Sequence, residues 1–112
     1  MFFEAKYKRE YLNDQVFIDI KLFWEWFEYN KTEIEGLILK GDKRVLQLFE
    51  NEFKKIFKLY SKQIPLSIGF NEKEYTLYIH YGRNSYLLTI GDSVMEEMPR
   101  HLKNNWTFLV VK

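Results

Sequence analysis

The sequence predicts an α+β fold, in which an N-terminal helical hairpin packs on an antiparallel sheet of three to four strands and a short helix precedes the last strand. Apolar residues in the first half recur at spacings of three and four, which indicates amphipathic helices. After Pro65 the spacing changes towards two, which is typical of strands. With 112 residues, of which 46% are apolar, the chain is expected to form a single domain over residues 1–112.

The first predicted helix covers residues 16–38, and Asp14 is a candidate cap for an earlier start. Trp26 lies off the apolar stripe of this helix, so it is either a second packing contact or an exposed ring. Residues 1–15 show only a weak strand-like alternation, which leaves an edge strand or a dimerisation segment open. The stripe itself consists of Ile20, Phe23, Trp24, Phe27, Ile34, Leu37 and Ile38.

The second predicted helix covers residues 43–61 and has the clearest amphipathic pattern in the chain. A short turn around Gly41 precedes it, with Asp42 as the expected N-cap. Because the link between the two helices is short, we expect them to form an antiparallel hairpin. The second stripe consists of Val45, Leu46, Phe49, Phe53, Ile56, Phe57 and Tyr60.

Three strands are predicted at residues 66–70, 74–81 and 106–111, with a turn at 71–73 joining the first two. One face of the sheet is expected to pack on the stripe of the second helix. The side chains expected on that face are Tyr75, Leu77 and Ile79, together with Trp106 or Phe108.

The segment between these strands has two interpretations. We favour a strand at 85–90 followed by a short helix at 91–102, because Gly91 disfavours a continuous helix by about 1 kcal/mol relative to alanine. In that arrangement Asp92 or Ser93 is the expected helix cap. The alternative is one helix, whose apolar face would consist of Tyr86, Leu87, Ile90, Val94 and Met98.

Charge is balanced overall but uneven along the chain. The 17 Lys and Arg residues against 16 Asp and Glu give a net charge of +1, which argues against a nonspecific nucleic-acid or membrane-surface binder. Residues 19–35 hold five acids and two bases, whereas residues 40–62 hold seven bases and three acids. Either the two helices complement each other across the hairpin, or they present faces of opposite sign to a charged partner.

Targeting and membrane signals are not evident in the sequence. Charged residues interrupt the N-terminus before an apolar stretch can form, and no apolar run approaches the roughly 20 residues of a membrane span. We therefore expect a cytoplasmic protein without a membrane partner.

Catalytic constellations are not apparent either. The chain has no cysteine and two histidines, His80 in a strand and His101 near a helix end, without the spacing of a metal site. The segment Gly91-Asp92-Ser93 resembles the Gly-Asp-Ser block of the GDSL-type hydrolases, but the Asp-x-x-His motif of that family does not follow it. The prediction is a protein with no catalytic residues, no metal and no cofactor.

The block Phe23-Trp24-Glu25-Trp26-Phe27 opens the central part of the first helix. This block, together with Pro99 and the segment Asn105-Trp106-Thr107-Phe108, resembles small uncharacterised bacterial proteins with an FWxWF helix block. The resemblance covers residues 20–112. In size and style the chain also resembles immunity proteins, which bind and neutralise a toxin domain. This second resemblance implies a protein partner, with a toxin domain as the specific candidate.

Segregated charge and an aromatic content of 19% favour a non-catalytic protein-binding module. The residues expected to contact the partner are Trp26, Tyr78, His80 and Arg83. The oligomeric state is left open.

Two alternatives remain at this level. One is a small-ligand-binding protein or enzyme with an aromatic pocket near His80. The other, disfavoured by the charge balance, is a single-stranded nucleic-acid binder that stacks bases on Tyr75 and Tyr81 beside Lys73 and Arg83.

Overall fold

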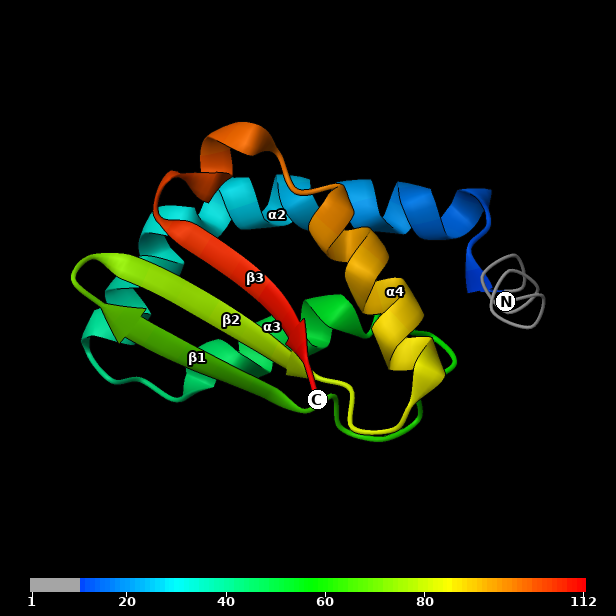
Figure 1. Ribbon diagram of the computed structural model, residues 1–112. Coiled ribbons are helices and arrows are strands. Elements are labelled where there is room, and N and C mark those ends of the chain that lie inside the picture. Colours follow the sequence, from blue (N-terminus) through cyan, green and yellow to red (C-terminus); the bar gives the residue numbers. More distant parts are fainter. Residues whose placement is uncertain (1–10) are drawn as a thin grey trace.

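The computed structural model describes residues 11–112. Within this range, two helices come before a three-stranded sheet in the chain, and the helices cover one face of that sheet (Figure 1). The edge strand or dimerisation segment that the sequence leaves open for residues 1–15 lies mostly outside the described residues. The elements in chain order are α2 (Asp14–Leu39), α3 (Arg44–Phe53), β1 (Leu66–Asn71), β2 (Glu74–His80), α4 (Ser85–Glu96), the 3₁₀ helix η1 (Arg100–Asn104) and β3 (Trp106–Val111).

Helix α2 confirms the first predicted helix, with a different cap. Asn13 is the N-cap, and its side chain accepts a hydrogen bond from the backbone N–H of Val16 at 3.0 Å. Asp14 is instead the first helical residue, where its negative charge favours the positive end of the helix. The helix ends before Gly41, which takes a φ of 68° that a residue with a Cβ adopts at a cost.

Helix α3 is shorter than predicted, because it ends at Phe53 and not near residue 61. The N–H groups of Ile56 and Phe57 both donate to the carbonyl of Phe53, at 2.9 and 2.8 Å, which tightens the last turn and ends the regular helix. Lys54 then donates to backbone carbonyls of the loop, including that of Tyr60 at 3.1 Å. Ile56 and Phe57 are nevertheless buried, so the predicted stripe belongs to the core even where it is not helical.

Strands β1 and β2 form the predicted antiparallel hairpin, closed by the pair Asn71 and Glu74. The two residues between them, Glu72 and Lys73, both have positive φ, at 49° and 72°. This is the backbone of a type I′ turn, whose twist matches the twist of the strands.

The last strand corrects the prediction of a purely antiparallel sheet. The strand order is β1-β2-β3, and β3 runs parallel to β2 with Tyr75 opposite Trp106. Parallel neighbours require a crossover connection, and α4 with η1 supplies it. The sheet is therefore mixed.

The favoured strand at 85–90 is wrong, since residues 85–96 form the single helix α4. Asn84 caps it by accepting from the N–H of Leu87 at 3.0 Å, so neither Asp92 nor Ser93 is a cap. Gly91 lies where α4 packs against β3, and a Cβ at this position would come within 2.9 Å of Val110 Cγ2. The close approach of α4 to β3 therefore explains why a glycine lies inside this helix, although glycine lowers helix propensity.

The core lies between the sheet and the helices, and it is rich in aromatic contacts. Phe23 of α2 stacks on Phe53 of α3 at 4.6 Å between ring centroids. Trp106 stacks on Tyr75 at 4.9 Å, and the Trp24 indole N–H donates to the carbonyl of Val94 at 3.0 Å, which ties α2 to α4. The predicted core face is confirmed, because its members Tyr75, Leu77, Ile79, Trp106 and Phe108 are all buried.

Within residues 11–112, every helix is too short or too polar to traverse a lipid bilayer.

Candidate functional site

The sheet has a second face, which the helices leave uncovered. Figure 1 shows this face towards the viewer, with α2 and α3 behind the sheet. Because side chains alternate along a strand, the pairing register fixes its members. We call it the outer sheet face, formed by Ser67, Gly69, Thr76, Tyr78, His80, Thr107 and Leu109.

Tyr78 and His80 form the centre of this face. Their rings stack at 6.1 Å between centroids with 29° between the planes. His80 Nε2 lies 2.8 Å from the Ser67 hydroxyl, so the imidazole is held by the neighbouring strand. The Tyr78 ring reaches across to Gly69, whose missing side chain leaves room for it; a Cβ there would lie 3.6 Å from Tyr78 Cε2. Two ring-bearing side chains are thus held on rigid strands at an open surface.

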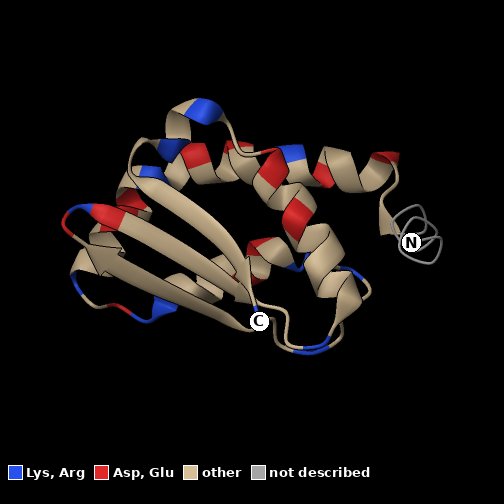
Figure 2. Cartoon of the chain, in the orientation of Figure 1, with Lys and Arg blue, Asp and Glu red and all other residues tan. Residues whose placement is uncertain are grey.

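The strands that form this face carry few charged residues. Figure 2 shows the strands almost free of charged residues. In the sequence, Glu72, Lys73 and Glu74 lie where β1 turns into β2. Leu109 adds an apolar contact, since 41% of its surface is exposed. The surface combines a phenol, an imidazole, hydroxyl groups and an exposed aliphatic side chain.

The other two predicted binding residues lie elsewhere. Arg83 is exposed in the turn after β2, where Gly82 has a φ of 58°. Trp26 is half-buried and packs against Phe49 and Phe23, each at 5.7 Å between centroids. Trp26 is therefore a packing contact on the helical side, and the structure does not bring it to Tyr78 and His80.

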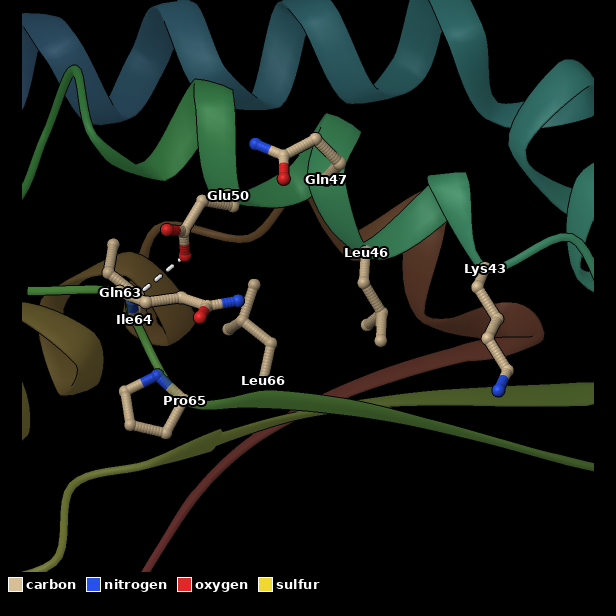
Figure 3. Close-up of a pocket in the computed structure, with 8 residues that line it drawn as sticks. All are labelled: Lys43, Leu46, Gln47, Glu50, Gln63, Ile64, Pro65 and Leu66. Carbon is tan, nitrogen blue, oxygen red and sulfur yellow. Dashed lines mark hydrogen bonds between the residues drawn. The ribbon is translucent and has the colours of Figure 1, made fainter.

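A pocket with a volume of about 470 Å³ lies between α3 and the start of β1 (Figure 3). Glu50 lines it and is only 9% exposed. Its Oε2 accepts a hydrogen bond from the N–H of Ile64 at 2.8 Å, whereas Oε1 has no hydrogen-bond partner within residues 11–112. We call it the α3–β1 pocket, lined by Lys43, Leu46, Gln47, Glu50, Gln63, Ile64, Pro65 and Leu66.

Sequence reasoning did not single out Glu50. A signal was available, because Glu50 follows Leu46 by four residues and precedes Phe53 by three, which places an acid at the edge of an apolar stripe. Such a position predicts a buried carboxylate with a hydrogen-bond donor nearby.

A second pocket, of about 310 Å³, lies beside α2. Trp24 and Pro99 contribute apolar walls, and Glu25, Glu28 and Glu97 contribute carboxylates. Glu28 already pairs with His101, whose Nε2 lies 2.7 Å from Glu28 Oε1. Two further pockets, of about 330 and 190 Å³, are both lined in part by Asp19. His80 is absent from the lining of each of these four pockets.

The two segments of opposite charge complement each other only in part. Asp19 of α2 pairs with Lys58 of the second segment at 3.0 Å. Other acids of α2 pair elsewhere, as Glu35 does with Lys31 at 2.8 Å. The complementary interpretation is therefore confirmed at Asp19 and Lys58, while faces of opposite sign that meet a charged partner stay a prediction.

Carboxylates with shifted pKa values have structural roles. Burial raises the pKa of Glu35, but hydrogen bonds from Lys31 and from the Trp106 indole outweigh this, so the net pKa is lowered from 4.5. Hydrogen bonds from the Arg44 side chain and backbone lower the pKa of Asp42 to about 2. Asp42 thereby satisfies an N–H of the first turn of α3, next to the N-cap Lys43.

In the part of the chain that the structure describes, no group of three or more acidic, histidine or cysteine side chains is placed to hold a metal ion. The chain matches no protein-family model, and no significant match to a curated protein or a solved structure was found.

Proposed function

We propose that this protein is a non-catalytic protein-binding module and that the outer sheet face holds the partner. The observation that carries the proposal is the half-buried pair Tyr78 and His80, stacked at 6.1 Å, on a face that the helices leave uncovered. Tyrosine is favoured at protein interfaces because its ring buries apolar area while its hydroxyl still bonds. A broad surface of this kind suits another protein better than it suits a small ligand, which requires a concave site.

The arrangement also lowers the entropic cost of binding. The 2.8 Å contact between His80 and Ser67 restricts the imidazole before a partner arrives. The strand backbone is held on both sides, since β2 pairs with β1 and β3. Side chains that are ordered in advance lose less conformational freedom on association.

The alternatives receive less support from the geometry. A ligand or substrate pocket near His80 would require that residue to line a cavity, and its ring lies instead on the outer sheet face. A nucleic-acid platform on Tyr75 and Tyr81 would require open rings, and Tyr75 is only 6% exposed beneath Trp106. Within the proposal, a toxin domain is the partner implied by the resemblance to immunity proteins, and the cytoplasm is the expected location.

The test is affinity capture from the native cells, followed by titration of the purified partner against variants. The face variant carries Tyr78→Ala and His80→Ala. We expect it to bind about 30-fold more weakly or worse, since truncating an interface hot spot costs about 2 kcal/mol. Tyr29→Ala is the matched control, because Tyr29 is 90% exposed on α2, and it should bind like the wild type.

Circular dichroism should give the same folded signal for all three proteins. Equal affinity of the face variant and the wild type would remove the outer sheet face from the proposal.

A further inference from the structure

Strand β1 is an edge of the sheet. It comes first in the order β1-β2-β3, and within residues 11–112 no strand pairs with its other side. The N–H of His80 donates to the carbonyl of Pro65 at 2.9 Å, so Pro65 and every second residue after it bond to β2. The backbone N–H and C=O groups of the residues in between point away from β2, and these residues are Leu66, Ile68 and Phe70.

The edge lacks the usual features that prevent strand pairing. Proteins protect edge strands with charged residues, prolines or bulges. The segment Leu66–Asn71 contains no charged residue and no proline, and it pairs with β2 in continuous register without a bulge. Phe70, on the core side of the strand, remains 45% exposed. This edge can therefore accept another strand.

The α3–β1 pocket adjoins the same edge. Leu66 of β1 and Leu46 of α3 both line it, as Figure 3 shows. A strand added beside β1 would place its own core-side residues next to Leu66, at this pocket. The pocket volume of about 470 Å³ leaves space for a large side chain.

We propose that a second copy of this chain adds its β1 to this edge, antiparallel, around a two-fold axis at Ile68. In that register Leu66 faces the partner's Phe70, and Phe70 faces the partner's Leu66. All outward backbone groups of these residues then find partners, and each exposed Phe70 lies at the α3–β1 pocket of the other copy. The two sheets join into one of six strands.

The charges on α3 fit the same axis. Lys43 and Glu50 both line the pocket and lie about two helical turns apart on one side of α3. An antiparallel two-fold arrangement brings Lys43 of one copy towards the partner's Glu50. This supplies a cation to the carboxylate oxygen Oε1, which has no partner within residues 11–112. The interface is self-complementary in strand register, in shape and in charge.

Sedimentation velocity over a range of concentrations tests this dimer. The dimer does not depend on whether the outer sheet face binds a partner protein. The wild type should show a reversible monomer–dimer equilibrium. Ile68→Pro should be monomeric, because it removes an N–H that bonds only across the interface. Ile68→Val is the matched control and should dimerise like the wild type, as should Tyr78→Ala.

Reversed charges give a second comparison. Lys43→Glu should raise the dimer dissociation constant on the order of tenfold, because it places an anion near the partner's Glu50. Lys103→Glu reverses a charge on η1, away from β1, and should leave the constant unchanged.

Amide hydrogen exchange of the wild type provides a measurement that needs no variant. The N–H groups of Ile68 and Phe70 should be protected at high concentration and should exchange faster on dilution, while those of Ser67 and Gly69 stay protected. A wild type that is monomeric at all concentrations would overturn the proposal. So would a dimer that persists in Ile68→Pro, or Ile68 and Phe70 amides whose exchange is independent of concentration.

Discussion

The two faces of β2 differ in what their side chains meet. On one face Tyr75, Leu77 and Ile79 are at most 6% exposed and pack into the aromatic core. On the other, Tyr78 and His80 are only half-buried and contact mainly their neighbours on the sheet. Both faces carry tyrosine, so residue type alone does not separate core from surface. The position of the residue in the alternation does, because a strand sends successive side chains to opposite sides.

The comparison predicts very different costs of truncation on the two sides of the sheet. Phe53 is fully buried beneath the core face, so Phe53→Ala should lower the free energy of unfolding by about 3–5 kcal/mol. Leu109→Ala, on the outer sheet face, should cost about 0.5 kcal/mol or less, because Leu109 is already 41% exposed. Urea denaturation of both variants measures the difference, and similar losses would break the comparison.

Two glycine-to-alanine substitutions, one at the α4–β3 contact and one in α2, test how closely α4 packs on β3. Gly91→Ala should lower the free energy of unfolding by about 1–3 kcal/mol, because its Cβ would lie 2.9 Å from Val110 Cγ2. This loss opposes the gain of about 1 kcal/mol that alanine normally brings to a helix. Gly36→Ala in α2 is the control, and it should stabilise the protein by roughly 0.5–1 kcal/mol because its Cβ meets nothing within 4 Å.

A double-mutant cycle identifies the contact responsible. Adding Val110→Ala should recover part of the loss in Gly91→Ala, so the two substitutions should not be additive. Additive losses would show that Gly91 is required for another reason.

The smallest expected effect is the pH dependence of stability that comes from Glu35. The pKa of Glu35 is lowered from 4.5 in the folded state, so its contribution is present above that value and is lost as pH falls through the folded pKa. Glu35→Gln should therefore reduce the fall in melting temperature between about pH 5 and pH 3. Glu33→Gln, an exposed site on the same helix, should follow the wild-type profile. Identical profiles for all three proteins would argue against a stabilising role of the ionised Glu35.

Much of the candidate site was predictable, because strand alternation already placed Tyr78 and His80 together on the face opposite Leu77. Their partner Ser67 was not, since it lies on another strand and only the hairpin register brings it to His80. The prediction that Trp26 contacts a partner depends on its place off one apolar stripe, and the structure adds that its ring also packs against Phe49 of the neighbouring helix. A single-helix pattern cannot show what a second helix contributes.

By itself the sequence determined the local elements: α2, the position of the β1–β2 turn, and the aromatic stripes that become core. These depend on periodicity and turn chemistry within a few residues. Only the tertiary structure decided the parallel direction of β3, the end of α3 at Phe53 and the continuous helix through Gly91. The direction of β3 and the helix through Gly91 involve residues far apart in the chain, such as Tyr75 with Trp106 and Gly91 with Val110. The packing energy of those contacts outweighs the local preference, which for Gly91 is only about 1 kcal/mol.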